Sequence, residues 1–489
     1  MRLTASDLYL YLRPERCGRR VFLKEQGEEE AEPSPYAQVL RRLGLQHERD
    51  HLASFAEFVD LRLGDESQRA EMTLEQVEAG APVLYQPVLF GTASVGGLEC
   101  EIVGIPDFLI KNNGEYIVRD SKISRRITEK DHPEILEQLG LYAWLYERNF
   151  GSAPSGVQVH SGSGEIVEVP YDGGVAALET LSEIVKSKRE RIEPRDPVGW
   201  SRCTSCGYFD YCWKTAEEKR DVALVFGVDQ GLARQLYADG IDTFDRLCSE
   251  FDGETLAEYQ RPWGKGMRRV GKSAPRILTM AEALASNEEI PLAPLNLPEH
   301  STWVMFDLEG LPPHLDELEK IYLWGLQVFG DNAGSYQSAT AGFGPEGDRE
   351  AWDEFLETAN VVFQEHGDVP FVHWHHYEKT EINRYIERFG DTDGIGERVI
   401  KNLLDLRPLT REAVALPLPS YSLKVVEQYI GFERTQTEYG GDWAMAKYIE
   451  ATETEDEALR AEVMDAILEY NREDLEATWA VLQWLQAKA

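Results

Sequence analysis

The chain has 489 residues, which exceeds what one hydrophobic core normally holds and suits about three domains. Hydrophobic residues make up 42% of it, and no apolar run approaches the roughly 20 residues that span a bilayer. The start, MRLTASDLYLYLRPERCGRR, lacks the apolar centre of a signal peptide. These features exclude a helical membrane protein and predict a cytoplasmic one without a membrane partner.

The charge balance is strongly acidic: 50 Lys and Arg residues stand against 87 Asp and Glu, which gives a formal net charge of −37. Taken alone, this charge disfavours a polyanionic partner. The acidic residues are spread over the whole chain, however, which favours adaptation to a salty cytoplasm, where salt screens repulsion within a few ångströms. Basic segments such as RERIEPR, RR at 125–126 and KGMRR then become informative, although each is also typical of a solvated surface.

Taken in chain order, the composition changes twice and indicates four parts. Residues 1–220 hold five of the six cysteines. Residues 221–290 predict short helices, in GLARQLYADGIDTFDRLC and GKSAPRILTMAEALA, with Gly-containing turns. The Pro-rich IPLAPLNLPEH then predicts a linker over residues 291–300, and residues 301–489 form the last part.

The last part alternates strand and helix patterns. WVMFDLEG, IYLWGLQVFG and PFVHWHHY predict strands, whereas REAWDEFLETANVVFQEH and AEVMDAILEYNREDLEATWAVLQWLQ predict helices. This order suits a mixed sheet covered by helices, as in a ribonuclease H-like fold. The whole chain is therefore expected to be an α/β multidomain protein.

Four cysteines have an arrangement typical of a metal site. Cys17 stands alone near the start, and Cys203, Cys206 and Cys212 form C-x2-C-x5-C far downstream. Closely spaced thiols in a cytoplasmic protein indicate metal binding rather than disulfides. Four thiolates suit structural zinc or a [4Fe–4S] cluster. A zinc ribbon normally has two C-x2-C pairs and this chain has one, which favours the iron–sulfur cluster and leaves zinc as the alternative.

The segment LECEIVGIPDFLIKNNGEYIVRDSKIS predicts a β-hairpin, because two β-rich runs flank Asn-Gly, the preferred pair for a type I′ turn. Such a turn pairs Asn112 with Glu115. Continuing that register sets Asp107 opposite Asp120 on one face of the sheet. Two facing carboxylates repel each other, so a bound cation is the natural reason to place them there.

Residues near the hairpin extend this candidate site. Lys122 shares the face of Asp120 and could stabilise charge that develops on phosphorus, although a surface salt bridge would explain the same pair. Upstream, LGLQHERDHLASF predicts a helix that carries His47, a nitrogen donor for a metal. Downstream, EILEQLGLYAWLYE predicts a helix with Gln138 and Tyr142 one turn apart on one face.

His47, G-x-x-D at 104–107, D-x-K at 120–122 and Q-x-x-x-Y at 138–142 occur in that order, between one early cysteine and a closing C-x2-C-x5-C. This pattern over residues 1–215 resembles the RecB-like PD-(D/E)xK nucleases that carry an iron–sulfur cluster, including AddB-type and CRISPR-associated four-cysteine enzymes. The resemblance implies a restriction-endonuclease-like fold and cleavage of DNA, often at single-stranded ends.

The resemblance also implies a role for each matched residue. His47, Asp107 and Asp120 are implied to hold Mg²⁺ or Mn²⁺. Lys122 is implied to be catalytic, together with the two aspartates. The residues implied to contact DNA are Gln138 and Tyr142, and those implied to bind the cluster are Cys17, Cys203, Cys206 and Cys212.

A second set of carboxylates lies in the last part of the chain. Asp307 and Glu309 are two residues apart on a predicted strand, so both point the same way. In the last predicted helix, Tyr470 and Asp474 are four apart and also share a face. Such acids at one point of a sheet suit two metal ions that serve an in-line attack on a phosphodiester.

FDLEG, HWHHYEKTEINRY, YSLKVVEQYIG and YNREDLEAT resemble the DEDD exonucleases, especially YprB-type ribonuclease H-like domains, over residues 300–487. The resemblance implies that Asp307, Glu309 and Asp474 hold metal and that Tyr470 belongs to the catalytic set. The middle motif departs from the pattern, because Glu378 stands where these enzymes usually have Asp. Glu378 is then the expected metal ligand, with Asp405 on a predicted strand as a substitute or support.

Residues 221–290 resemble a helix-hairpin-helix DNA-binding element, although ordinary helical packing explains the pattern equally well. Together these features predict a metal-dependent DNA nuclease with two active sites, an exonuclease or end-processing enzyme of repair, recombination or defence. The alternatives are a nucleic-acid-binding scaffold with one inactive nuclease fold, or a C-terminal site that acts on RNA. No G-x-x-x-x-G-K-[ST] motif is present, so helicase activity would need a partner protein.

Overall fold

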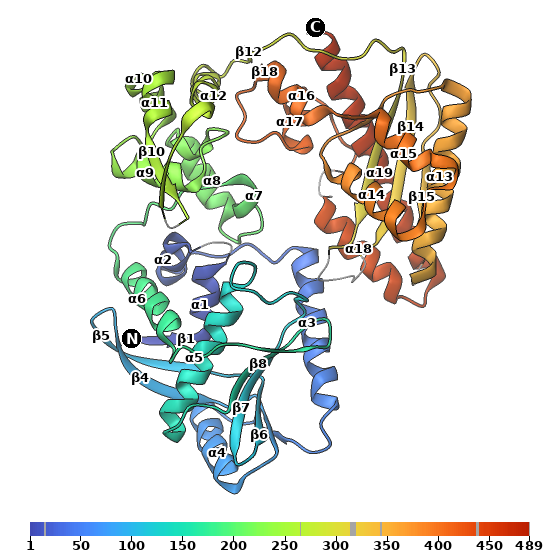
Figure 1. The fold of residues 1–489 in the computed structure, drawn as a ribbon. Coiled ribbons are helices and arrows are strands. Elements are labelled where there is room, and N and C mark those ends of the chain that lie inside the picture. Colours follow the sequence, from blue (N-terminus) through green and yellow to red (C-terminus); the bar gives the residue numbers. More distant parts are fainter. Residues whose placement is uncertain (14–15, 265, 313–318, 343–344, 437–439, 489) are drawn as a thin grey trace.

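A computed structural model describes the chain except residues 14–15, 265, 313–318, 343–344, 437–439 and 489. The N-terminal and C-terminal parts are each built on β-sheet covered by helices, and a mainly helical part connects them (Figure 1). Among the residues that the structure describes, no helix is long and apolar enough to cross a membrane.

The N-terminal part contains a six-stranded sheet in the order β2-β3-β6-β7-β8-β9 and a three-stranded sheet in the order β1-β5-β4. Helix α5 (Pro133–Phe150) packs its apolar face against both sheets. Strand β7 (Glu115–Ser121) buries every second residue along most of its length, which is the period of a sheet covered on one face. The other elements are β1 (Arg2–Thr4), β2 (Val59–Asp60), β3 (Val83–Tyr85), β4 (Leu89–Val95), β5 (Leu98–Gly104), β6 (Phe108–Asn112), β8 (Gly156–His160), β9 (Ile166–Glu168), α1 (Ala5–Leu12), α2 (Gly18–Gln26), α3 (Pro35–Ala53), α4 (Glu66–Ala79) and α6 (Val175–Arg189).

The predicted hairpin at Asn113–Gly114 is confirmed, together with its register. Strands β6 and β7 are antiparallel, and Asn112 lies opposite Glu115. The two turn residues have φ values of 50° and 93°, the left-handed values that a type I′ turn requires. Continuing the register brings Asp107, just before β6, opposite Asp120 in β7.

The middle part is mainly helical, as the sequence predicts, but it also contains a hairpin that the sequence analysis missed. Strands β10 (Gln260–Trp263) and β11 (Gly266–Arg269) pair antiparallel between helices. Their sequence, QRPW and GMRR, has no apolar alternation, so the strands left no period-two signal. The helices are η1 (Val222–Leu224), α9 (Gln230–Ala238), α10 (Phe244–Glu250), α11 (Gly253–Glu258), η2 (Gly271–Ser273) and α12 (Ala274–Ser286).

The C-terminal part is a five-stranded sheet in the order β15-β14-β13-β16-β17. Its central strand β13 (Thr302–Gly310) is antiparallel to β14 (Ile321–Gly330) and parallel to β16 (Phe371–His373). All three predicted strands and both predicted helices are present. The other elements are β15 (Gln337–Thr340), β17 (Leu403–Asp405), β18 (Val414–Ala415), α13 (Pro345–His366), α14 (Tyr377–Phe389), η3 (Thr392–Gly394), α15 (Ile395–Asn402), α16 (Leu406–Ala413), α17 (Leu423–Tyr429), α18 (Gly441–Glu453) and α19 (Glu457–Gln486).

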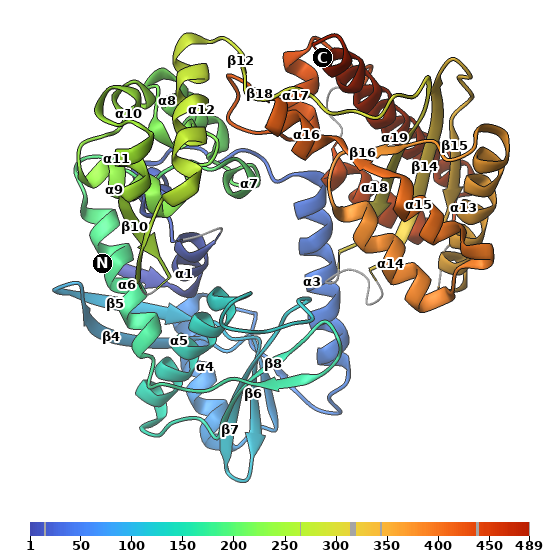
Figure 2. The ribbon, with the colours of Figure 1, turned by 45° about the horizontal axis from the view of Figure 1, so that its top comes forward.

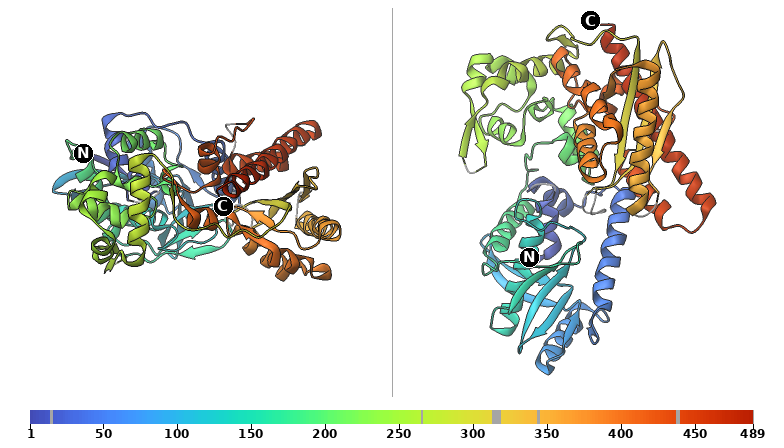
Figure 3. Two further views of the ribbon diagram at one scale, coloured as in Figure 1. Left: turned by 90° about the horizontal axis from the view of Figure 1, so that it is seen from above. Right: turned by 45° about the vertical axis from the view of Figure 1, so that its right-hand side comes forward.

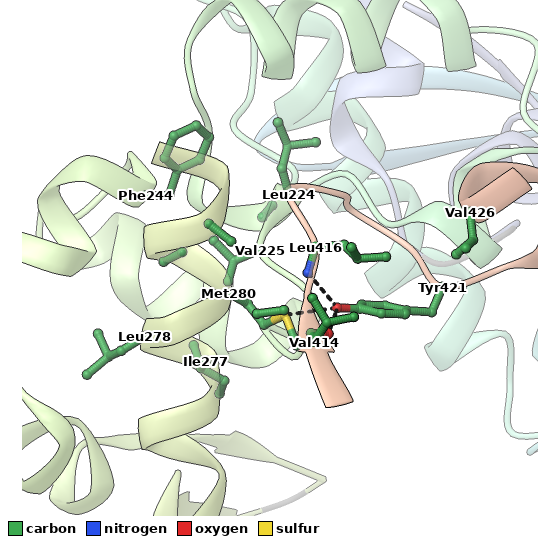
Figure 4. Packing of buried hydrophobic residues seen from close by; sticks show 14 of the residues in the cluster. Leu224, Val225, Phe244, Ile277, Leu278, Met280, Val414, Leu416, Tyr421 and Val426 are labelled. Atoms are coloured by element: carbon green, nitrogen blue, oxygen red, sulfur yellow. Dashed lines mark hydrogen bonds between the residues drawn. The ribbon is translucent and has the colours of Figure 1, made fainter. Parts of the chain in front are cut away.

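The middle and C-terminal parts share one hydrophobic cluster, which Figure 4 shows around Tyr421. The Tyr421 hydroxyl accepts a hydrogen bond from the N–H of Leu416 (2.8 Å) and donates one to the carbonyl of Val414 (2.9 Å). It also lies 3.5 Å from Met280 Sδ of α12. The predicted linker starts as a short strand, β12 (Ile290–Pro291), which pairs with β18. The linker is therefore joined to the C-terminal part from its first residues.

Helix α3 connects the N-terminal part to the C-terminal part (Figure 3, right). Its first half packs Val39 and Leu43 against the hydrophobic cluster of the C-terminal part. Arg42 forms an ion pair of 2.7 Å with Glu453, the last residue of α18. Its second half carries His47, the predicted ligand of the first site. The same helix thus contacts β7 of the N-terminal part and α18 of the C-terminal part.

Candidate active sites

The first candidate site lies where β6 begins and β7 ends. The N–H of Asp107 donates to Asp120 Oδ1 (2.9 Å), and the N–H of Ser121 donates to Asp107 Oδ2 (2.8 Å). Lys122 Nζ lies 3.0 Å from Asp120 Oδ2. The structure therefore brings together Asp107, Asp120 and Lys122, the three residues that the hairpin register predicted as neighbours.

The electrostatics of this site indicate an excess of negative charge. Burial and repulsion from Asp120 raise the pKa of Asp107 well above its usual value. Burial opposes the charged form of Lys122, but attraction to Asp120 and Asp107 outweighs burial and raises the pKa of the ammonium. One carboxyl is thus driven toward protonation while the other holds the ammonium, and a divalent cation would relieve that repulsion.

Gln138 and Tyr142 reach the same site from α5. Tyr142 is only 5% exposed, and burial together with the charges of Asp120 and Asp107 raises its pKa. The Gln138 side chain forms a hydrogen bond with Tyr142. Gly104 makes this approach possible, because a Cβ there would lie 2.7 Å from Tyr142 Cδ1. A direct contact of these two side chains with DNA stays a prediction.

His47 and Glu48 approach the first site from α3. The His47 ring stacks on His160 with 4.3 Å between centroids, and His47 Nε2 lies 3.2 Å from the His160 carbonyl oxygen. Glu48 Oε1 accepts from Gln86 Nε2 (2.8 Å), and the same nitrogen donates to Asp107 Oδ1 (3.0 Å). Glu48 is therefore an acidic neighbour of the site that sequence reasoning missed. Its position next to His47 on one helix was the available signal.

The four predicted cysteines meet near the start of α2. Cys17 precedes α2, Cys203 ends α7 (Trp200–Cys203), and Cys212 lies in α8 (Phe209–Glu218). All three line a single cavity together with Cys206, and no cysteine of the chain forms a disulfide. Burial and the nearby Asp196 raise the pKa of Cys17 to about 12. Four soft sulfur donors around one cavity fit a metal centre.

The second candidate site forms where β13 meets α19. Carboxylate oxygens of Asp307, Glu309 and Asp474 lie within 4.8 Å of one another. Burial and the charge of Asp474 raise the pKa of Glu309 to about 8, and the same two causes raise the pKa of Asp307 well above its usual value. Two buried acids and one partly buried acid that repel one another have the donor chemistry of a cation site.

Two cations from the segment that begins at α17 compensate part of this negative charge. Arg434 donates to both oxygens of Glu427 (2.6 and 2.7 Å) and to Asp474. Burial opposes its charge, but these bonds outweigh burial and raise the pKa of Arg434. Lys424 lies close enough to Asp474 and Glu309 to interact with both charges. Neither cation was predicted, because both are distant in sequence from the acids that they meet.

Asp307 is held in place by its neighbour Asn471. Asn471 Nδ2 donates to Asp307 Oδ2 (2.8 Å), and the Tyr336 hydroxyl donates to Asn471 Oδ1 (2.9 Å). Gly325 in β14 leaves room for the amide, because a Cβ there would lie 1.7 Å from Asn471 Oδ1. Sequence reasoning also missed this series of hydrogen bonds, although Asn471 stands inside the YNRED motif.

The remaining predicted residues lie around Asp307, Glu309 and Asp474 at different depths. Tyr470 is 4% exposed, and burial and the nearby acids raise its pKa. Glu378 shares a hydrogen bond of 2.9 Å with His373 Nδ1, and its charge contributes to the raised pKa of Asp307. Asp405 ends the predicted strand β17 and caps α16. The metal role of Glu378 stays a prediction.

Comparison with known protein families agrees with this division into two sites. Residues 14–213 match the PD-(D/E)XK nuclease superfamily, and residues 304–486 match the RNase_H superfamily. The chain carries two nuclease-superfamily domains. The two domains hold one candidate site each, and the predicted fold class is confirmed. The more specific resemblances, to four-cysteine AddB-type and YprB-type proteins, stay predictions.

Individual proteins give less information than the family models. No curated protein matches the chain significantly. Among solved structures, the chain is similar to the crystal structure of SSO0001 at 18% sequence identity and a TM-score of 0.24. That similarity covers 43% of this chain and 85% of the other chain.

Proposed function

We propose that the chain is a metal-dependent DNA nuclease with two active sites, which acts as an exonuclease or on DNA ends in repair, recombination or defence. The observation that carries the proposal is that each nuclease-superfamily domain contains its own buried carboxylate cluster. Burying like charges together costs stability unless a cation binds them. Two such clusters in one chain therefore favour two catalytic centres over a structural role.

In the first site, Asp107 and Asp120 would hold Mg²⁺ or Mn²⁺, and His47 or Glu48 would complete the ligand set. Bound divalent ions at such a site supply activated water and neutralise charge on the phosphate. Lys122 stays positively charged because its pKa is raised, so it can stabilise negative charge in the transition state.

In the second site, Asp307, Glu309 and Asp474 would hold the metal ions, with Glu378 as the fourth acid. The close spacing of their oxygens suits ions that share ligands. Tyr470 keeps its proton because burial and the acids raise its pKa, so its hydroxyl can orient a water molecule by donating a hydrogen bond.

We further propose that Cys17, Cys203, Cys206 and Cys212 hold a [4Fe–4S] cluster, with zinc as the alternative. The four thiols share one cavity, and a shared ligand would tie the start of the chain to residues near 200. Anaerobically purified protein should be brown and absorb near ~400 nm. Colourless protein with stoichiometric zinc would decide for the alternative. Cys17→Ser should remove the bound metal and lower the melting temperature of the N-terminal domain.

A second candidate function is a nucleic-acid-binding scaffold in which the C-terminal domain is inactive. The observation that favours it is the hydrogen bond from Arg434 to Asp474, because the guanidinium occupies an oxygen that a metal ion would need. In that case Arg434 would neutralise part of the charge of Asp307, Glu309 and Asp474, and these acids would bind no metal ion.

Cleavage of labelled single-stranded and double-stranded DNA and RNA, with Mg²⁺ or Mn²⁺ across a salt series, separates these functions. The proposal expects that Asp120→Ala leaves part of the activity and that adding Asp307→Ala removes the rest. Equal activity of the single and double variants would assign the scaffold function to residues 301–489. Cleavage of RNA alone by the Asp120→Ala variant would assign the second site to RNA.

A further inference from the structure

A large groove lies between the N-terminal domain, the cysteine cluster and the hairpin of the middle part. It encloses about 1260 Å³, and Cys206 lines it beside residues of α1 and β10. Figure 2 shows β10 directed toward α1 across this region. The hairpin lies outside residues 14–213, which match the nuclease superfamily, so the groove is a feature of this chain's domain arrangement. Its basic lining residues are Arg13, Arg16, Arg20, Lys130, Arg234 and Arg261.

The lining of the groove is richer in cations than the rest of the chain. It holds six Lys and Arg residues but only three carboxylates, whereas the whole chain has a net charge of −37. All five arginines of the lining form ion pairs: Arg13 with Glu134 and Arg261 with Asp229 inside it, and Arg16, Arg20 and Arg234 with Glu137, Glu30 and Asp196 outside it. These pairs offset much of the positive charge, but a guanidinium binds phosphate in the same geometry as carboxylate, so a polyanion can exchange for these partners.

The outer end of the groove carries an exposed aromatic platform. The register of β10 and β11 places Arg261 opposite Arg268 and Trp263 opposite Gly266, so Arg261, Trp263 and Arg268 share one face. Trp263 is 54% exposed. The guanidinium carbons of Arg261 and Arg268 lie 4.5 and 5.1 Å from its ring centroid. Lys265 lies outside the described residues.

The inner end of the groove carries a second aromatic residue beside the start of α5. Tyr9 of α1 is 43% exposed, and the guanidinium of Arg13 lies 5.8 Å from its ring centroid. Arg13 also forms an ion pair of 2.8 Å with Glu134, in the first turn of α5, the helix that carries Gln138 and Tyr142. The groove thus runs from Trp263 to the start of α5, the helix that brings Tyr142 to the first active site.

We propose that this groove binds single-stranded DNA, with Trp263 and Tyr9 stacking on bases and the arginines contacting phosphates, and that it guides the strand to the first active site. Bases of a duplex are stacked on one another, so only an unpaired strand offers its base faces to side chains. Alternating aromatic and guanidinium groups are the chemistry that such a strand requires. The proposal rests on the proposed nuclease function of the first site.

The hairpin itself supplies matched variants for a binding test. Fluorescence anisotropy would follow binding of a labelled oligothymidine in metal-free buffer, where no cleavage occurs. Trp263→Ala should weaken binding at least about fivefold, and Trp263→Phe should weaken it less, because base stacking on an aromatic ring contributes about that much. Met267→Ala and Arg269→Ala alter the opposite face of the same hairpin, so they should leave affinity within about twofold.

Unchanged affinity of Trp263→Ala would overturn the proposal, as would tighter binding of duplex DNA or RNA than of single-stranded DNA by the unaltered protein. As a second measurement, photocrosslinking with 5-iodouracil DNA should label the peptides that contain Trp263 and Tyr9. Mg²⁺-dependent cleavage is measured separately. Normal binding by Trp263→Ala, with partial loss of cleavage in Asp120→Ala and full loss in the Asp120→Ala/Asp307→Ala protein, would reject the groove alone. Loss of binding in Trp263→Ala with full cleavage by the Asp120→Ala/Asp307→Ala protein would reject the proposed function alone.

Discussion

Replacing Gly325 by alanine tests whether the second site depends on the orientation of Asp307. The added Cβ would lie 1.7 Å from Asn471 Oδ1, far inside van der Waals contact, so the Asn471 amide must move. Moving it breaks the bond of 2.8 Å from Asn471 Nδ2 to Asp307 Oδ2. Asn471 is completely buried, so water cannot replace the lost donor without further rearrangement.

The expected loss follows from the strength of a hydrogen bond to a charged group. Such a bond contributes about 1.5–3 kcal/mol, and that loss in the transition state slows turnover about 10-fold to 150-fold. The assay is Mg²⁺-dependent cleavage in Asp120→Ala protein, in which only the second site remains. Gly334→Ala is the matched control, because a Cβ there meets only Val328 Cβ at 3.8 Å, an ordinary contact.

Because Gly325→Ala is expected to act through Asn471, it should reduce turnover about as much as Asn471→Ala does. The Gly325→Ala/Asn471→Ala double variant should then be no slower than the single variants. Melting curves would show whether each variant remains folded. Full activity of Gly325→Ala, or a double variant whose losses multiply, would refute the reasoning.

Three further predictions concern the N-terminal domain. Lys122→Ala should lower kcat far more than it weakens DNA binding, and equal losses would contradict a transition-state role. Glu48→Ala and His47→Ala should differ in Mn²⁺ affinity measured by calorimetry, and the larger loss identifies the third ligand. Burial and His160 lower the pKa of His51 to about 3, below its unfolded value near 6.5. The free energy of unfolding should therefore fall as pH falls from about 6.5 toward 3. Melting curves of His51→Phe should show a smaller fall over the same range. An equal fall in both proteins would contradict a neutral, buried His51.

The first site could be predicted because its geometry is encoded locally. An Asn-Gly turn fixes the register of its own hairpin, and the two-residue period of a strand then decides that Asp107 and Asp120 meet. Lys122 follows from the same period. The four cysteines were predicted to meet because thiols at ligand spacing have few other uses in a chain of this kind.

Residues that depend on packing between distant segments could not be predicted in this way. Asn471 reaches Asp307 only because Gly325, on a neighbouring strand, leaves space for it. Arg434 reaches Asp474 from the segment between α17 and α18. Glu48 approaches Asp107 because α3 packs beside the hairpin. None of these contacts leaves a periodic or short-range signal in the sequence.

The acidic composition and the basic groove together indicate which interaction should dominate DNA binding. Salt that screens the repulsion between DNA and a chain of net charge −37 also weakens every phosphate contact in the groove. Stacking on an aromatic ring has no such dependence, because it involves no net charge. At high salt, the condition that the acidic composition favours, the proposed strand binding should therefore depend more on Trp263 than on any single arginine of the groove. The exposure of Trp263 on the hairpin is consistent with that requirement.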